Sequence, residues 1–386
     1  MIRNKGILYI SIALLFCACV KPFTPVLDDN SVNKYVVQGM VGSIEGWQTV
    51  QVSRTSTIEL AEYIPVNSCA VSIVDDAGNS FELSQFDEGL YRVWMNESDL
   101  VAGRSYKVII STPTGDILES DFDKMPQGPD EVGDVYFELA SIQTDDPERI
   151  LYGIQFFTDF SADEGDGNYY RWQCTETYEY RSPYPLQFYY DGSVHEVSPP
   201  DSSKMVCYKT NGIEDVFTLA TINLATKEYP AFPLNFVQNT SDRLEILYSL
   251  LVEQYAISLD AYNYYDKLRI NLQQSGGLYT SQPLAIKGNL VNTSNEENEV
   301  LGFFQASSVA QKRVFVEAPV EGLTLEYFGG CTVNTLLFGF VEISPTEYPA
   351  YLFAADGNWT MAVMTKNCVD CTLAGGVTLK PDYWPN

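Results

Sequence analysis

The sequence is poor in histidine, in basic residues and in long apolar runs. His195 is the single histidine, and 23 Lys and Arg stand against 51 Asp and Glu, which gives a net charge of −28 at pH 7. A nucleic-acid-binding protein needs the opposite sign of charge, because basic side chains displace the counterions of the phosphates. The composition therefore excludes nucleic acid as a partner and argues against a face that adheres to anionic lipid.

A single histidine also limits the catalytic sites that the sequence can encode. A Ser-His-Asp triad would have to use His195, and no G-x-S-x-G nucleophile elbow accompanies it. There is no Walker loop, and no G-x-G-x-x-G segment follows a predicted strand. No segment singles out a pair of carboxylates for glycoside cleavage, although 51 acidic residues leave such a pair open. We expect an exposed His195 and a protein without catalytic activity or cofactor, with a surface hydrolase of unknown substrate as the alternative.

The N-terminus has the composition of an export signal. Arg3 and Lys5 precede an apolar stretch from Ile7 to Phe16. This stretch is well short of the roughly 20 residues that a membrane-spanning helix needs. A basic start followed by a short apolar run is typical of a secretory signal peptide, which we assign to residues 1–18.

The predicted cleavage site has the form found in bacterial lipoproteins, in which a small residue precedes the cysteine that receives lipid. Ala18-Cys19 fits this pattern, whereas Cys17 follows the bulky Phe16. We predict a lipidated Cys19, a tether over residues 19–33 and a membrane anchor made of lipid, since more than one acyl chain gives stable anchoring. The alternative is an ordinary signal peptide cut after Ala18 and a secreted protein.

Six cysteines remain once Cys17 and Cys19 are assigned to the signal and the lipid. They are Cys69, Cys174, Cys207, Cys331, Cys368 and Cys371. Export places them in an oxidising compartment, where structural disulfides persist, but the sequence alone cannot choose the pairing. The C-x-x-C of Cys368 and Cys371 lacks the βαβ context of a redox motif and the additional ligands of a zinc site. We expect structural disulfides and no metal.

A series of short β-type runs follows the tether. They are Lys34–Val41, Thr49–Ser53, Cys69–Val74, Ser80–Ser84, Leu90–Trp94, Tyr106–Ser111 and Asp116–Ser120. Turn signals separate them, as in Asp75-Asp-Ala-Gly-Asn79, and no long helical pattern intervenes. This spacing predicts an immunoglobulin-like β-sandwich over residues 34–126, which ends at Met125-Pro-Gln-Gly-Pro129.

Residues 130–386 are predicted to form a larger β-rich domain with one substantial helix near 259–274. Ser258 can cap this helix, and Asp260 suits its positive N-terminal end. Strands are expected again towards the C-terminus, at Val300–Gln305, Arg313–Val316, Thr335–Ile343 and Trp359–Met364. The whole chain is therefore predicted to be mainly β.

An aromatic segment from Tyr178 to Tyr190 contains six aromatic residues and two prolines. Planar rings on a loop suit protein hot spots and sugar faces. We predict that Tyr184, Phe188 and Tyr189 belong to a surface that binds a partner or cargo. The alternative is that the rings fold back over a small core of their own.

Several segments, taken in order, give the chain a resemblance to the domain-of-unknown-function 4249 family of outer-membrane lipoproteins from the Bacteroidetes. They are Tyr35-Val-Val-Gln-Gly39, Ala70–Gly78, Ala102–Tyr106, Met125-Pro126, Asn168-Tyr-Tyr-Arg-Trp172, Cys207-Tyr208, Ala261-Tyr-Asn-Tyr-Tyr265, Gly288-Asn289, Leu301-Gly-Phe-Phe304 and, as the most specific, Cys368–Trp384. The resemblance implies a first domain similar to carboxypeptidase-regulatory-like sandwiches. It also implies a disulfide from Cys207 to Cys368 or Cys371, because it marks all three positions.

The resemblance further implies an address and a partner. Members look like accessory components of TonB-dependent transporters, the β-barrels that import nutrients across the outer membrane. For this chain it implies an outer-membrane lipoprotein at the cell surface that docks on such a barrel and helps to capture or gate an unspecified cargo. It provides no catalytic residue to carry over.

Overall fold

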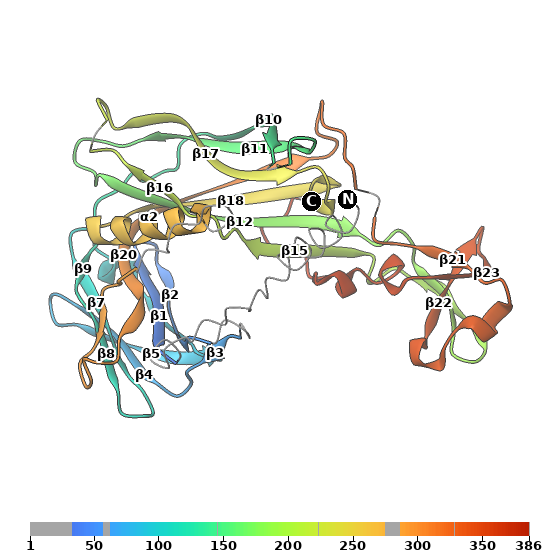
Figure 1. Ribbon diagram of the computed structural model, residues 1–386, viewed down its shortest axis with the longest axis horizontal. Coiled ribbons are helices and arrows are strands. Elements are labelled where there is room, and N and C mark those ends of the chain that lie inside the picture. Colours follow the sequence, from blue (N-terminus) through green and yellow to red (C-terminus); the bar gives the residue numbers. More distant parts are fainter. Residues whose placement is uncertain are drawn as a thin grey trace, which may run out of the picture.

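The computed structural model describes residues 33–56, 62–144, 146–222, 224–274, 286–327 and 329–385. Within them the chain is mainly β with one substantial helix, α2 (Leu259–Gln274), as the sequence predicts. Figure 1 shows an elongated molecule with a sandwich at the lower left, a central pair of sheets above it and a small lobe at the right. No helix in this part of the chain combines the length and the apolar character needed to cross a membrane.

The N-terminal sandwich is built from short, mostly antiparallel strands. They are β1 (Tyr35–Gly42), β2 (Gly46–Arg54), β3 (Ile64–Pro65), β4 (Ala70–Asp75), β5 (Ser80–Asp87), β6 (Leu90–Met95), β7 (Ser105–Ser111), β8 (Ile117–Ser120) and β9 (Asp123–Lys124). Alternation places every second side chain in the core. In β7, for example, Tyr106, Val108 and Ile110 are fully buried. These positions agree with the strands that the sequence predicts.

Two later strands complete this sandwich, so it does not consist of residues 34–126 alone. β19 (Leu290–Asn292) pairs with β8, and the first half of β20 (Val300–Glu317) runs parallel to β1, from Val300 opposite Tyr35 to Ser307 opposite Gly42. The second half of β20 pairs with β18 (Leu247–Ala256) in the central sheet. One 18-residue strand therefore connects the two parts, where the sequence predicts two separate strands.

Two facing sheets form the centre of the molecule (Figure 1). One has the order β15 (Val206–Gly212), β12 (Tyr169–Arg181), β18 and β20, with β16 (Phe217–Ala220) also paired to β12; the other has the order β10 (Val135–Gln143), β11 (Ile150–Ser161) and β17 (Glu228–Gln238). Aromatic rings fill the space between them, with Trp172 stacked on Phe232 at 4.4 Å and Phe156 on Tyr248 at 5.7 Å. Burial of each such side chain stabilises the fold by roughly 1.5–3 kcal/mol.

Gly302 sets the position of β20 against the sandwich. Its φ is +100°, and a Cβ built there would lie 1.9 Å from the carbonyl oxygen of Val37. Only glycine tolerates both conditions. The next residues then alternate, because Phe304 and Ala306 belong to the sandwich core whereas Phe303 packs under α2.

The small lobe contains a sheet of the order β14 (Val194–Asp201), β13 (Leu186–Tyr190), β22 (Ala350–Ala355), β23 (Asn358–Met364) and β21 (Val333–Thr335). Short 3-10 helices accompany it at Gly339–Glu342, Pro345–Glu347, Lys366–Cys368 and Cys371–Ala374. The predicted strand Thr335–Ile343 is wrong. The chain turns at Gly339, whose φ is +81°, and then forms a 3-10 helix instead of continuing β21.

Candidate functional site

A pocket of about 510 Å³, which we call the waist pocket, lies where the sandwich, the central sheet and α2 meet. Its lining comprises Gln38, Met40, Thr49, Gln51, Phe303 and Gln305 from the sandwich, Arg171, Gln173, Glu253 and Tyr255 from the central sheet, and Tyr264, Tyr265 and Leu268 from α2, together with Gly39 and Leu90. Most of these side chains are polar amides or aromatic rings. The pocket therefore combines hydrogen-bonding groups with flat apolar surfaces.

Strand register brings the amides of the sandwich wall together. Gln38 lies opposite Gln51 of β2 on one side and opposite Phe303 of β20 on the other. Met40 likewise lies opposite Thr49 and Gln305. Opposed residues share a face, so this row of side chains covers the face of the sheet that points away from the sandwich core. α2 and the central sheet lie opposite that polar face, and the space enclosed between them is the waist pocket.

Arg171 is held between two tyrosine rings in this pocket. Its guanidinium carbon lies 4.7 Å from the ring centroid of Tyr255 and 4.3 Å from that of Tyr265. One terminal nitrogen donates to Oε1 of Gln173 at 3.4 Å, whereas Nε–H is buried and has no acceptor. Cation–π contact holds the guanidinium in place but does not satisfy that N–H. Arg171 therefore contributes an unused hydrogen-bond donor.

Gln305 contributes an unused polar atom of the opposite kind. The residue is 1 % exposed, its Nε2 donates to Oγ of Ser307 at 2.8 Å, and its buried Oε1 has no partner. Turning the amide over exchanges oxygen and nitrogen, so one of the two stays unpaired in either orientation. An unpaired buried polar atom costs about 1–3 kcal/mol, and native proteins contain few of them.

Burial keeps two tyrosines of the waist pocket, Tyr255 and Tyr264, protonated at neutral pH. Burial raises the pKa of Tyr264 to about 12 and raises that of Tyr255 further.

The ring of Tyr264 lies 5.1 Å from that of Phe303, so α2 is packed directly onto the sandwich. Ser258 caps this helix, because its Oγ accepts from the backbone N–H of Ala261 at 3.1 Å.

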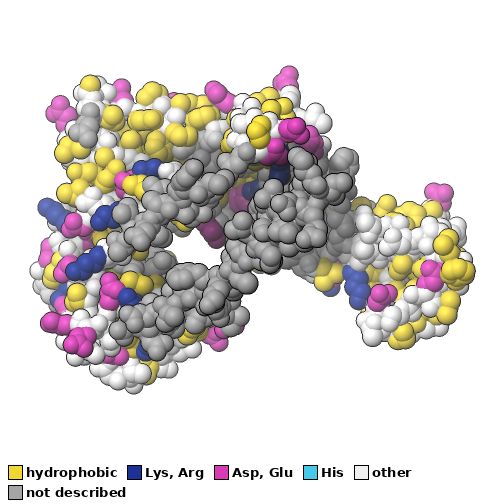
Figure 2. Space-filling model, in the orientation of Figure 1, with side chains coloured by type: hydrophobic (Ala, Val, Ile, Leu, Met, Phe, Trp, Pro, Cys, Tyr) yellow, Lys and Arg dark blue, Asp and Glu magenta, His cyan; other side chains and the backbone are white. Residues whose placement is uncertain are grey.

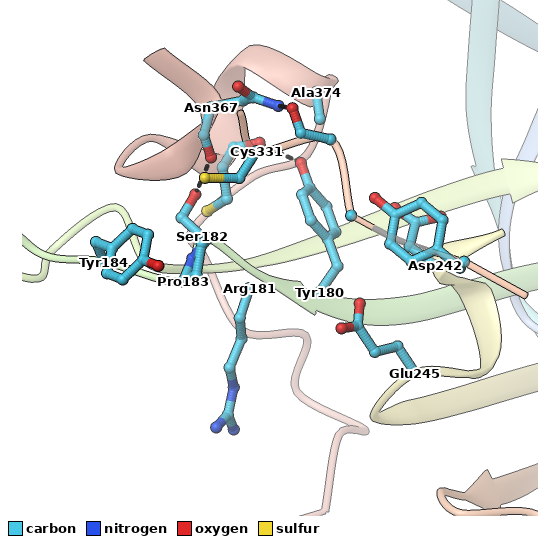
Figure 3. Close-up of a pocket in the computed structure, with 14 residues that line it drawn as sticks. Tyr180, Arg181, Ser182, Pro183, Tyr184, Asp242, Glu245, Cys331, Asn367 and Ala374 are labelled. Carbon is cyan, nitrogen blue, oxygen red and sulfur yellow. Dashed lines mark hydrogen bonds between the residues drawn. The ribbon is translucent and has the colours of Figure 1, made fainter. Parts of the chain in front are cut away.

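A second pocket of about 430 Å³, the junction pocket, lies between the central sheet and the small lobe (Figure 3). The hydroxyl of Tyr180 donates to the carbonyl oxygen of Cys371, and the hydroxyl of Ser182 donates to that of Asn367 at 2.7 Å. Burial raises the pKa of Asp242 and of Glu245, which also line the pocket. These contacts attach the lobe to the end of β12.

Nowhere in the described ranges do three or more His, Cys, Asp or Glu side chains gather closely enough to hold a metal.

The structure contains two disulfides, whose pairing the sequence alone could not determine. Cys207 is bonded to Cys371, one of the two pairings that the family resemblance implies. Cys331 is bonded to Cys368. Both bridges border the junction pocket and tie the C-terminal segment to β15 and to the small lobe. The lipidation site predicted at Cys19 lies outside the described residues, as do the signal peptide and most of the tether.

The prediction that Cys174 forms a disulfide is wrong, and Cys69 is a free cysteine as well. Cys174 is fully buried in β12 within the apolar core of the central sheets, whereas Cys69 packs against the core of the sandwich. The two thiols belong to different cores, so neither can serve as the partner of the other. Burial raises the pKa of Cys174 to about 12, which makes it an inert core side chain.

The aromatic segment is not a loop with outward-facing rings. Its first part completes β12 and its last part is β13, in which Phe188 is 6 % exposed and lies opposite Leu352. Tyr184 packs edge-to-face on Phe353 at 5.3 Å, and Tyr189 is half-buried. The alternation of a strand turns Phe188 inward. The prediction of an exposed surface is therefore wrong for Phe188, and these rings mainly build the core of the small lobe.

His195 is partly exposed, with 41 % of its side chain accessible, and stacks on Tyr189 at 4.8 Å. Its Nε2 lies 2.8 Å from Oδ1 of Asp191 and 3.0 Å from Oγ of Ser193. A catalytic triad uses the two ring nitrogens separately, one towards the serine and the other towards the carboxylate. The three residues therefore do not have the arrangement of a triad.

The waist pocket could not be predicted from local sequence patterns. Its residues are scattered over six strands and one helix, and pairing across the sheet brings them together only in the fold. A signal was nevertheless present. Four of the segments that carry the family resemblance meet at this pocket and supply Gln38, Arg171, Tyr264 with Tyr265, and Phe303.

Comparison with known proteins identifies a family rather than an activity. No curated protein matches the chain. Among solved structures, trypsin-activated alpha-2-macroglobulin from Escherichia coli aligns with 62 % of this chain and 15 % of its own, at 9 % identity and a TM-score of 0.18, a likeness too weak to support an argument. The sequence profile of a family described as a domain of unknown function, DUF4249, matches residues 20–313, and the chain therefore belongs to this family.

Proposed function

We propose that this protein is a surface-exposed outer-membrane lipoprotein of the Bacteroidetes type that serves as an accessory component of a TonB-dependent transporter, in nutrient capture or gating. The signal sequence with Ala18-Cys19 supports the lipid anchor, and the resemblance to the DUF4249 family supports the transporter as partner. The lining of the waist pocket, rich in amides and aromatic rings, suits binding more than catalysis.

One surface feature carries the docking part of this proposal. Leu337, Phe338 and Val341 are 80, 81 and 85 % exposed at the turn that follows β21, and we call these three residues the apolar tip. Figure 2 shows hydrophobic side chains gathered on the outer end of the small lobe. A cluster of large exposed apolar side chains marks an interaction site, because their exposure to water is unfavourable. The apolar tip thus offers a docking element on the small lobe.

The partner proposed for the apolar tip is protein rather than lipid. A chain with a net charge of −28 is repelled by an anionic membrane surface, and the lipid on Cys19 already provides the anchor. Glu342, whose carboxylate accepts from the backbone N–H of Phe338, adds negative charge beside the tip. Apolar side chains with a polar rim are typical of protein interfaces.

Affinity capture from membranes tests this function. The tagged full chain is extracted in mild detergent, and co-purifying proteins are identified by mass spectrometry. We expect a TonB-dependent barrel with the wild type. The variant Leu337→Ser/Phe338→Ser/Val341→Ser should lose most of it, at least about tenfold, since central apolar anchors contribute strongly to binding.

A matched control is available on the sandwich. Ile44, Val101 and Ile117 are 43, 43 and 40 % exposed, so Ile44→Ser/Val101→Ser/Ile117→Ser replaces the same number of exposed apolar side chains at another place. This control should retain the barrel, and neither triple variant should change the melting temperature much. Capture of no barrel by the wild type, or equal capture by the tip variant, would contradict the proposal. Recovery with lipid vesicles alone would identify the tip as a membrane contact instead.

A further inference from the structure

We propose that the waist pocket is a binding site for a short neutral oligosaccharide. This inference rests on the proposed function: it names the class of cargo that the protein would capture. The volume of about 510 Å³ lies within the range of about 300–1,000 Å³ that is usual for small-molecule sites.

The unpaired atoms suit a ligand that both accepts and donates hydrogen bonds. Nε–H of Arg171 needs an acceptor, and the amide of Gln305, 1 % exposed, has an oxygen that needs a donor. A hydroxyl group does both, and a sugar ring carries several in fixed positions. The amides of Gln38, Gln51 and Gln173 add donors and acceptors without charge, which suits the same chemistry.

The charge of the lining favours a neutral ligand. Arg171 and Glu253 are the two charged residues among those that line the pocket, and their formal charges cancel. Oε1 of Glu253 accepts from Nε2 of Gln311 at 2.8 Å, which holds this side chain in place. With a net charge of −28 on the whole chain, an anionic ligand would meet a repulsive field.

The walls argue against an extended peptide as the occupant. Peptides commonly add to the free edge of a sheet through main-chain hydrogen bonds. Here β1 is paired on both sides, with β2 and β20, and β18 is paired with β12 and β20. The pocket is therefore bounded by the faces of sheets, and side chains rather than main-chain groups meet the ligand.

Aromatic rings provide the surface for the apolar face of a sugar. Tyr265 and Tyr264 of α2 line the pocket beside Leu268, and their rings meet at 5.3 Å in an edge-to-face pair. Such large rigid rings give contact area at a small entropy cost. Capping by Ser258 and packing on Phe303 fix the helix that presents them.

Isothermal titration calorimetry on the purified full chain tests the inference without any transporter. The probes are mono- to tetrasaccharides of glucose, galactose, mannose, xylose and N-acetylglucosamine. Two comparison ligands are digalacturonate, which is a charged sugar, and dialanine, which is a short peptide. We expect at least one neutral oligosaccharide to bind at least tenfold more tightly than digalacturonate and dialanine. Absence of binding by every neutral sugar, or tighter binding of either comparison ligand, overturns the inference.

Two variants locate the binding in the waist pocket. Gln305→Leu should weaken binding of the best sugar at least tenfold while leaving the melting temperature unchanged or higher, because it removes an unpaired buried polar atom. Arg171→Lys keeps the charge, loses Nε–H and should also weaken binding tenfold. Gln143→Leu and Arg313→Lys, outside the pocket, should bind within twofold of the wild type.

If Gln305→Leu and Arg171→Lys both bind the sugar as tightly as the wild type does, the sugar binds elsewhere and the inference is overturned. The inference is also overturned if Gln305→Leu lowers the affinity for the sugar and the melting temperature together, because that result assigns Gln305 a structural role. The capture of a barrel by the apolar tip is measured separately. Failure of sugar binding therefore leaves the docking proposal standing, and failure of docking leaves the pocket standing.

Discussion

Cys207 in β15 and Cys371 in a C-terminal 3-10 helix are joined by a disulfide across a sequence separation of 164 residues. This bridge limits the freedom of the unfolded chain more than that of the folded one. We predict that Cys207→Ser/Cys371→Ser lowers the free energy of unfolding by about 4 kcal/mol in urea titrations of non-reduced protein. Cys69→Ser, which breaks no bridge, serves as control and should cost much less. Equal stability of the double variant and the wild type would refute the entropic role.

The number of free thiols gives a second prediction. Cys69 and Cys174 are the free cysteines of the described residues, and the proposed processing leaves no thiol at Cys17 or Cys19. Unfolding without reductant should expose two thiols to a maleimide probe, as counted by mass spectrometry. In the native state Cys174 should react very slowly, because it is fully buried and its pKa is raised to about 12. Labelling of four or more thiols would show that a bridge is absent.

Asp123 makes the stability depend on pH. Burial raises its pKa from 3.8 to about 6, although Oδ2 accepts from the backbone N–H of Ala306 at 2.8 Å. A carboxyl with a raised pKa contributes stability that is fully present below the unfolded value and is lost as the pH rises through the folded value. Asp123→Asn should therefore raise the free energy of unfolding by about 2–3 kcal/mol at pH 8, and by little near pH 3.5. Urea titrations at both values check this, and a variant less stable than the wild type at pH 8 would contradict it.

Phe188 and Tyr189 are neighbours in β13 that should respond differently to truncation. Phe188 is 6 % exposed against Leu352, whereas Tyr189 is half-buried and stacks on His195. We expect Phe188→Ala to cost about 3–5 kcal/mol and Tyr189→Ala about 1 kcal/mol or less, as measured by denaturant unfolding of the full chain. A larger loss from Tyr189→Ala would show that the orientation of β13 is wrong.

Local patterns in the sequence predicted much of the fold. Tyr106, Val108 and Ile110 alternate with Lys107, Ile109 and Ser111, and this period of two predicts that they share the buried face of a strand. Ser258 likewise marks the start of α2. The length of β20 was not predictable in the same way, because the small and polar residues 306–312 lack the pattern of a strand and separate the two strands that the sequence predicts.

The candidate sites depend on contacts that are distant in sequence. Arg171 and Gln305 belong to one pocket only because β20 serves both the sandwich and the central sheet. The apolar tip was predicted as a strand, since Leu337 and Phe338 have the residue types of one, and the turn at Gly339 changes the outcome. Periodicity reports which face of an element is apolar, but not what covers that face.

The central claim is that this chain works in a complex with a TonB-dependent barrel. Its most direct test is the composition of the particle that contains the wild-type chain after gentle detergent extraction, measured by size-exclusion chromatography with light scattering and mass spectrometry. The account predicts a particle in which the lipidated chain and one barrel elute together in a fixed ratio. Elution of the lipidated chain alone, with every barrel in other fractions, would contradict it.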